Sequence, residues 1–202
     1  MKLVLDKKHG NRIEFIVSGS SVAFTNMLRR YSISRVPIIA IDKVTFYDNT
    51  SAFWDEYLAH RLGLMPIISP DKTPESAEVI FSLDAEGPKT VYSSDLESSD
   101  KDIKMAKERI IIATLAQNQH LRLEAKAVPG IGKKHAKYQA GLVGYGEEDK
   151  GIRMFVESFY QMLPSDVLLR GCDEIESDIE DIEAALGKKK TAKKATKKTK
   201  KK

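Results

Sequence analysis

The stretch DEYLAHRLGLMP, residues 55–66, places four ionisable side chains close together. Glu56 and His60 are four residues apart, so on a helix they would share one face and could begin a metal or acid–base site. A helical zinc site needs two histidines at that spacing and a third ligand elsewhere, but none of the four histidines in the chain forms such a pair. We therefore interpret Glu56 and His60 as structural hydrogen-bonding residues, and keep a metalloenzyme as one alternative.

The motifs of nucleophilic and nucleotide chemistry are missing from the sequence. It contains no P-loop, no G-x-G-x-x-G and no G-x-S-x-G pattern. Cys172 is the only cysteine, which excludes an internal disulfide and a multi-cysteine metal cluster built by this chain alone. It falls on the apolar side of a predicted helix, so we expect a small buried thiol. The stretch GIGKKHAK, residues 130–137, is compatible with phosphate contacts and equally with a mobile basic loop.

Positive charge is concentrated at the C-terminal end. Residues 188–202, KKKTAKKATKKTKKK, contain ten lysines and no acid, and subtracting these from the net charge of +4 leaves −6 for the rest. The composition is typical of a disordered tail that could hold nucleic acid through phosphate contacts, with Lys188, Lys189 and Lys190 as the first candidates. The tail lacks aromatic residues for base stacking, and a solubilising extension is the other interpretation.

The N-terminal part predicts a hairpin and then a helix. Residues 2–6 and 12–17 predict two strands paired around the turn KHGN. Ser20 or Ser21 is the expected N-cap of the helix, and Pro37 ends it. The i, i+3, i+4, i+7 spacing predicts one apolar face, made of Phe24, Met27, Leu28 and Tyr31. Arg29 and Arg30 fall outside that face, so they are either solvated or placed to bind carboxylates of another protein.

A strand and a short helix come next. Residues 38–49 alternate in the manner of a strand. Thr50 or Ser51 is the expected cap of the helix that contains DEYLAHRLG, and Gly63 and Pro66 end it.

The remainder of the middle reads as strands and loops. Two short segments, 79–83 and 89–93, predict a hairpin across a Gly-Pro dipeptide, and residues 109–128 predict two strands joined by QNQ. The glycine-rich segment 129–151 predicts mostly loop, and residues 152–159 alternate as a strand.

The last helix carries the most regular pattern. Six apolar residues recur with spacings of 4, 3, 4, 3 and 4, and they are Leu168, Cys172, Ile175, Ile179, Ile182 and Leu186. This 3.5-residue repeat is typical of a helix that packs along a partner helix, and we call these six residues the seam. The longest apolar runs are VPIIAI and IIIATLA, too short to span a bilayer, so we expect a soluble cytoplasmic protein without membrane contact.

Residues 26–67, NMLRRYSISRVPIIAIDKVTFYDNTSAFWDEYLAHRLGLMPI, closely resemble a known family, the D-type subunits of archaeal DNA-directed RNA polymerase. That family is similar to the third-largest subunit of eukaryotic RNA polymerase II and to the N-terminal domain of the bacterial alpha subunit. The segments GPKTVYSSDL, LRLEAKAVPGIGKKHAK and FVES follow in the expected order, so the resemblance covers residues 1 to about 187.

The resemblance implies an α+β fold. Residues 1–46 and 146–187 would form a discontinuous dimerisation domain, made of the hairpin, helices and the long C-terminal helix. Residues 47–145 would form a mostly β insert domain in which DEYLAHRLGLMP is a structural helix, and residues 188–202 would be the lysine-rich tail.

The resemblance also implies a non-catalytic platform within a nucleotidyltransferase complex. The seam would pair with the small subunit L, Arg29 and Arg30 would contact the second-largest subunit, and the zinc-binding subunits N and P would dock nearby. DNA would be contacted only indirectly or through the tail. A basic-tailed nucleic-acid-binding protein stays the alternative.

Three positions depart from the family pattern. The usual H-A-K-W-x-P ends here in Tyr138 and Ala140, and Leu163 replaces the usual Ser or Thr before the proline that opens the last helix. Where some members insert a cysteine-rich domain this chain has only VGYGEEDKGI, so no iron–sulfur cluster and no other cofactor is expected.

Overall fold

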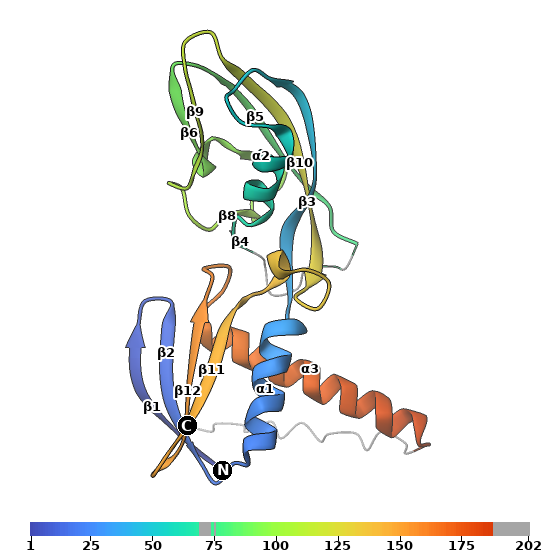
Figure 1. Ribbon diagram of the computed structural model, residues 1–202. Coiled ribbons are helices and arrows are strands. Elements are labelled where there is room, and N and C mark those ends of the chain that lie inside the picture. The colour runs from blue at the N-terminus through green and yellow to red at the C-terminus, as the bar shows by residue number, and fades with distance from the viewer. Residues whose placement is uncertain (69–73, 75, 188–202) are drawn as a thin grey trace, which may run out of the picture.

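The computed structural model describes residues 1–68, 74 and 76–187, so the tail with Lys188, Lys189 and Lys190 lies outside the described residues. Figure 1 shows two bodies stacked along an elongated molecule. The lower body contains both ends of the described chain, and the upper body contains its middle. Within the described residues the fold is mixed, mostly strands with three α-helices, which confirms the predicted α+β class.

The lower body is built on an antiparallel sheet in the order β1-β2-β12-β11. Its strands are β1 (Lys2–His9), β2 (Arg12–Ser18), β12 (Gly151–Ser158) and β11 (Gly141–Glu148). The predicted hairpin of β1 and β2 is confirmed, and Gly10 takes a positive φ of 53° in its turn. Pairing of β2 with β12 then joins the two ends of the described chain in one sheet.

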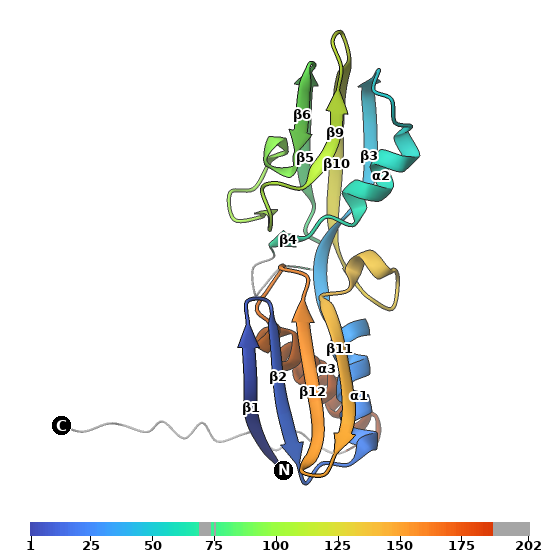
Figure 2. The ribbon, with the colours of Figure 1, turned by 60° about the vertical axis from the view of Figure 1, so that its left-hand side comes forward.

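Helices α1 (Val22–Ser34) and α3 (Pro164–Ala185) cover one face of this sheet (Figure 2). Ser21 caps α1 as predicted, because its Oγ accepts a hydrogen bond from the Phe24 N–H at 3.2 Å. The predicted apolar face of α1 is wrong in part. Leu28 packs against the lower core, but Phe24 is exposed, and the fully buried side chains are Thr25 and Ser32. At Ser32 the small side chain has a physical reason, because Gly171 of α3 lies so close that a Cβ on it would come within 2.4 Å of the Ser32 Oγ.

Strand β3 (Pro37–Asn49) connects the two bodies and confirms the predicted strand. Successive side chains of a strand point to opposite faces. Ile38 and Ala40 accordingly belong to the core of the lower body, whereas Ile39 and Ile41 belong to the core of the upper body. The first residues of β3 therefore pack into both cores, with alternate side chains in each.

The upper body contains a four-stranded sheet in the order β3-β10-β5-β7, two smaller two-stranded sheets and helix α2. Their bounds are β10 (His120–Ile131), β5 (Val79–Glu86), β7 (Glu97–Ser98), β4 (Ile67–Ile68), β8 (Lys104–Met105), β6 (Lys89–Tyr92), β9 (Ile111–Leu115) and α2 (Asp55–Gly63). Two short 3₁₀ turns span Ser93–Asp95 and Ala136–Tyr138.

The predicted hairpin across the Gly-Pro dipeptide at 87–88 is wrong. β5 pairs with β10, and β6 pairs with β9 in a different sheet. The chain changes sheets at Gly87, where a Cβ would lie 2.0 Å from the Ala116 carbonyl oxygen. The glycine therefore marks a close crossing of two backbones, not a tight hairpin turn.

The prediction of mostly loop for residues 129–151 is wrong over β11, which pairs with β12 along its whole length. Gly144 lies opposite Phe155 in this ladder, and a Cβ on it would come within 2.4 Å of the Phe155 ring. Glycine here makes room for an aromatic neighbour, which is why a glycine-rich sequence forms a regular strand.

The start of α2 differs from the prediction, whereas the start of α3 at Pro164 agrees with it. α2 begins at Asp55 with Trp54 as an N-cap that makes no side-chain bond. The predicted cap Ser51 does not cap the helix, and its hydroxyl instead donates to the Asn49 side chain at 2.6 Å. α3 begins after Leu163, and no side chain caps it.

The domain boundaries remain a prediction. Tyr138, Ala140 and Val143, which the sequence assigns to the insert, pack in the core of the lower body.

Candidate functional site

The six seam residues of α3 lie in two different environments. Some pack in the chain's own core and the others are exposed to solvent. Ile175 is buried and Leu168 packs partly against the lower core. Cys172 is exposed, and the exposed fractions of Ile179, Ile182 and Leu186 are 51%, 59% and 74%. Figure 1 shows why: the C-terminal half of α3 extends beyond α1 and the sheet. We call the four exposed residues the outer seam: Cys172, Ile179, Ile182 and Leu186. Among the described residues, the outer seam is not covered by the chain's own packing.

Further apolar residues lie on the same body, and the sequence analysis did not single them out. Leu169 is 62% exposed, three residues before Cys172. Leu3 and Leu5 of the edge strand β1 are both 56% exposed. Their β2 partners Val17 and Phe15 are buried in the lower core, so both leucines lie on the face of the sheet that the helices cover. Their signal in the sequence is the alternation KLVLD.

Cys172 does not have the surroundings of a nucleophile. Partial desolvation of its sulfur raises the pKa of the thiol, and the charge of Asp173 raises it further. The thiol therefore stays protonated at neutral pH. The expectation of a buried thiol is wrong, since Cys172 is exposed.

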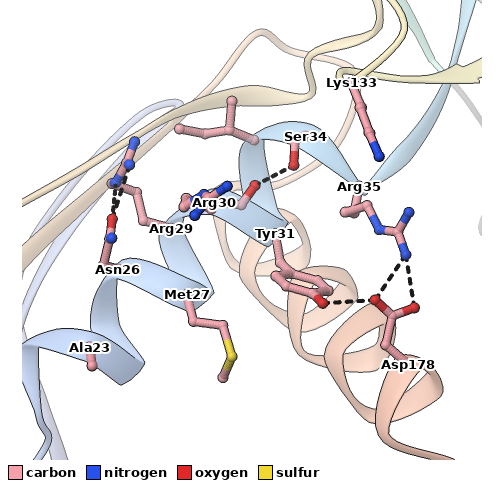
Figure 3. A pocket seen from close by; sticks show the side chains of 11 residues that line it. Ala23, Asn26, Met27, Arg29, Arg30, Tyr31, Ser34, Arg35, Lys133 and Asp178 are labelled. Carbon is pink, nitrogen blue, oxygen red and sulfur yellow. Dashed lines mark hydrogen bonds and ion pairs between the residues drawn. The ribbon is translucent and has the colours of Figure 1, made fainter. Parts of the chain in front are cut away.

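Arg29 and Arg30 line a pocket of about 670 Å³ between α1, the loop before Ala136 and α3 (Figure 3). The lining residues are Ala23, Asn26, Met27, Arg29, Arg30, Tyr31, Ile33, Ser34, Arg35, Lys133 and Asp178. The Asn26 Oδ1 accepts hydrogen bonds from Arg29 Nε at 3.2 Å and Nη2 at 3.0 Å, which fixes that guanidinium. Arg30 is exposed.

One wall of this pocket is an ion pair between the two helices. The carboxylate of Asp178 on α3 accepts two hydrogen bonds from Arg35 Nη2, both at 2.8 Å, and one from the Tyr31 hydroxyl at 2.7 Å. The hydrogen bond from Tyr31, together with that from Arg35, lowers the pKa of Asp178, so the group is ionised at neutral pH. Asp178 thereby ties α3 to the end of α1.

The GIGKKHAK loop supplies Lys133 to the same pocket. The Lys133 N–H donates to the Ser34 carbonyl at 2.9 Å, which attaches the loop to the end of α1. Gly132 permits this approach, because a Cβ there would lie 2.3 Å from the Ile33 carbonyl oxygen. The two motifs that the sequence presented separately, the arginine pair and this basic loop, are therefore brought together.

The far end of the loop is also fixed. Tyr138 is fully buried and its hydroxyl donates to Asp42 at 3.0 Å, while Lys137 Nζ lies 2.8 Å from the same oxygen. Burial, and then the bond to Asp42, raises the pKa of Tyr138 to about 12. The hydrogen bond from Lys137 holds the pKa of Asp42 below its usual value. The tyrosine that departs from the family pattern thus serves as a buried anchor.

Glu56 and His60 do not form a site. Both are exposed on α2, and no hydrogen bond joins the two side chains within the described part of the chain, so their role as structural hydrogen-bonding residues stays a prediction. Among residues 1–68, 74 and 76–187, no three or more His, Cys, Asp or Glu side chains are grouped so that they could hold a metal ion. α2 is a structural helix, held by the fully buried Leu58 and Leu62.

His120 forms a charged cluster in the upper sheet that the sequence analysis missed. Its Nδ1 lies 2.9 Å from Asp48 and its Nε2 lies 2.7 Å from Asp84. These hydrogen bonds, first to Asp48 and then to Asp84, raise the pKa of His120. The ring joins β10 to both neighbouring strands, β3 through Asp48 and β5 through Asp84.

No helix in the described part of the chain is long and apolar enough to cross a membrane.

Known proteins resemble this chain along most of its length. Residues 39–146 match the family model of the RNA polymerase Rpb3/RpoA insert domain. DNA-directed RNA polymerase subunit Rpo3 of Methanocaldococcus jannaschii is 42% identical over 170 residues, which cover 82% of this chain and 87% of that protein. The Rpo3 subunit of Thermococcus kodakarensis is 46% identical over 146 residues, which cover 69% of this chain and 56% of that protein.

A third relative, Rpo3 of Natronomonas pharaonis, is 47% identical over 132 residues, which cover 65% of this chain and 53% of that protein. The chain thus spans little more than half the length of the Thermococcus and Natronomonas relatives, but most of the Methanocaldococcus one. The match to the family model and the identity along nearly all of the Methanocaldococcus protein show that this chain belongs to the Rpo3 family of DNA-directed RNA polymerase subunits.

Proposed function

We propose that this chain is a non-catalytic assembly subunit of a DNA-dependent RNA polymerase. The observation that carries the proposal is the outer seam, a row of apolar residues on a helix that extends beyond the body of the protein. Apolar surface of this kind on a regular helix is typical of a site for another protein chain. Family membership supplies the complex in which that partner is found.

The small subunit L is the proposed partner of α3. A helix of subunit L would cover Cys172, Ile179, Ile182 and Leu186, and the exposed residues of β1 would extend the contact. Obligate interfaces of this kind bury on the order of 2,000 Å² or more and resemble a divided protein core. The other two seam residues, Leu168 and Ile175, would contribute indirectly, because they pack α3 against the lower body.

The second-largest subunit is the proposed partner of Arg29 and Arg30. Their pocket supports this role, because Arg30 is exposed there and a guanidinium group can bind a carboxylate in a fixed fork. The zinc-binding subunits N and P would dock on the resulting platform. DNA would be reached only indirectly or through the tail, and the subunit would act in the cytoplasm.

The chain contributes no catalytic residue and no cofactor in this proposal. An iron–sulfur cluster would need several cysteine thiolates, and the chain has Cys172 alone.

The decisive experiment is co-expression with subunit L, followed by size-exclusion chromatography with mass determination. The wild-type chain should elute as a 1:1 heterodimer. Ile179→Asp should weaken pairing by ~3 kcal/mol or more, about a hundredfold in Kd, because it buries a charge in the interface. Ile80→Asp is the matched control: Ile80 is 45% exposed, against 51% for Ile179, but lies on β5 in the upper body. Equal pairing of both variants would refute the seam as the partner surface.

Recruitment of the second-largest subunit tests the other surface. Arg30→Ala should leave the heterodimer intact and lower the yield of the three-subunit complex. An unaltered yield would show that the arginine role is wrong.

A further inference from the structure

We propose that the pocket around Arg29, Arg30 and Lys133 receives an acidic peptide segment of a partner protein. The inference rests on the proposed role of the arginine pair as a partner contact. It adds the chemistry of the partner, a stretch with two or more carboxylates, and Lys133 as a third receiving residue.

The charge of the pocket supports this assignment. Four of its lining side chains are cations, and its only acid is Asp178. Asp178 is already engaged by Arg35 and Tyr31. Within the described residues Arg29 bonds the neutral amide of Asn26, and none of Arg29, Arg30 and Lys133 has a carboxylate partner there. Three positive charges in one concave site are therefore left for a ligand that carries negative charge.

The pocket itself shows how it can hold a carboxylate. Both Asp178 oxygens accept from Arg35, and the Tyr31 hydroxyl completes the contact (Figure 3). Arg29 and Arg30 present the same planar donors between one and two turns earlier along α1. A carboxylate from outside would meet the kind of donors that already bind Asp178.

The shape of the pocket favours a peptide over nucleic acid. Apolar Ala23, Met27 and Ile33 line it beside the cations, so a ligand with both aliphatic and acidic groups fits better than a phosphate backbone. Its volume of about 670 Å³ is enough for a few side chains. A backbone-binding site would instead extend as a charged groove along several nucleotides.

Lys133 allows the proposed pocket to be tested separately from the two arginines. It comes from the loop that Gly132 holds against the end of α1, so its place in the pocket depends on tertiary structure. Its neighbour Lys134 does not line the pocket and lies over the Tyr138 ring, 5.5 Å from the centroid. The two lysines therefore give substitutions of equal charge, one inside the site and one outside.

The test is fluorescence anisotropy of a labelled hexaglutamate peptide with the full chain paired with subunit L. Lys133→Ala should weaken binding about three- to tenfold, the loss expected for one charge-assisted contact at a partly exposed site. Lys134→Ala should leave the affinity within about twofold, and the tail contributes equally in both variants. Asp178→Asn should tighten binding, because it releases Arg35 to the ligand.

Equal weakening by the two lysine variants would overturn the proposal, since it would show binding by diffuse charge. Stronger binding of a single-stranded oligonucleotide than of hexaglutamate, lost in Lys133→Ala, would also overturn it and assign the pocket to nucleic acid.

A parallel measurement of recruitment of the second-largest subunit distinguishes failure of the acidic-peptide site from failure of the proposed function. Loss of recruitment in Lys133→Ala without any hexaglutamate binding refutes the acidic chemistry and leaves the platform role standing. Hexaglutamate binding that depends on Lys133, with recruitment unaltered by Arg30→Ala and Lys133→Ala, supports the acidic-peptide site and refutes its assignment to that subunit.

Discussion

The contact between α1 and α3 gives the sharpest prediction, because it sets the direction in which the seam points. Gly171 of α3 lies directly against Ser32 of α1. A Cβ at Gly171 would come within 2.4 Å of Ser32 Oγ, 3.1 Å of its Cα and 3.2 Å of its backbone nitrogen. The Ser32 Oγ is itself buried, so it has little room to turn aside, and the two backbone atoms cannot move away on their own. Gly171→Ala must therefore push the helices apart.

Two opposing effects decide the size of this change. Alanine is favoured over glycine in a helix interior by about 1 kcal/mol. Overpacking a tight contact costs about 1–3 kcal/mol, and a contact at 2.4 Å belongs near the upper end. We expect a net loss of ~1–2 kcal/mol in the free energy of unfolding. The displaced α3 should also pair less tightly with its partner.

Equilibrium unfolding in urea measures the effect, with two comparison variants. Gly146→Ala is the matched control in β11, since nothing lies within 4 Å of its added Cβ, and it should be neutral or slightly stabilising. The double variant Ser32→Ala with Gly171→Ala should recover ~1 kcal/mol, because it removes the nearest atom. The Ser32 hydroxyl is buried without a hydrogen-bond partner among the described residues, so its loss is well tolerated.

A gain of about 1 kcal/mol for Gly171→Ala, as helix propensity alone predicts, would refute the reasoning. It would show that α1 and α3 are not packed at this distance in solution.

Three further predictions concern the upper body and the anchoring loop. Leu58→Ala should lower the free energy of unfolding by ~2–5 kcal/mol in a urea titration, since Leu58 is 0% exposed. The raised pKa of His120 gives stability that is complete below pH ~6.5 and is lost as the pH rises through the folded-state pKa. His120→Gln should remove that step from a series of unfolding curves between pH 5 and 8. Tyr138→Phe should cost ~1 kcal/mol through one hydrogen bond to Asp42, while Lys137 still holds the carboxylate.

Each of these has a result that contradicts it. A loss below 1 kcal/mol for Leu58→Ala would show that α2 is not essential to the upper core. If the free energy of unfolding depended on pH in the same way in wild type and His120→Gln, the step would not come from the His120 ring. A neutral Tyr138→Phe would indicate that the hydroxyl is solvated in the unbound chain.

Local patterns in the sequence were sufficient to predict most elements but not their pairing. The hairpin of β1 and β2, the strand β3 and helix α3 follow from periodicity within single segments. The longer upper strands were found, but β5 and β6 were paired with each other wrongly, because pairing depends on which strand lies alongside in space. The two-residue strands β4, β7 and β8 were missed. The glycine-rich β11 was missed since Gly144 is explained only by Phe155 on the neighbouring strand.

The candidate site was predictable in its parts and not in its assembly. Arg29 and Arg30 stood out by their place off the apolar face, and the seam by its spacing. Sequence spacing could not show that Ile175 turns inward while Ile179 stays exposed, because the heptad pattern does not distinguish the chain's own core from a partner's. Nor could it bring Lys133 and Asp178 beside the arginines, since both come from distant segments.

The lower sheet has a consequence for synthesis on the ribosome. Asn11 at the end of the first hairpin bonds Ser158, 147 residues further along. At a translation rate of about 5–20 residues per second, β2 waits roughly 7–30 s for β12 to be made. Through that interval the nascent chain carries an open strand edge and the apolar residues Leu3 and Leu5, a surface suited to chaperones. All strands of the upper body are made before β11 and β12, so the upper body can fold before the lower sheet is complete.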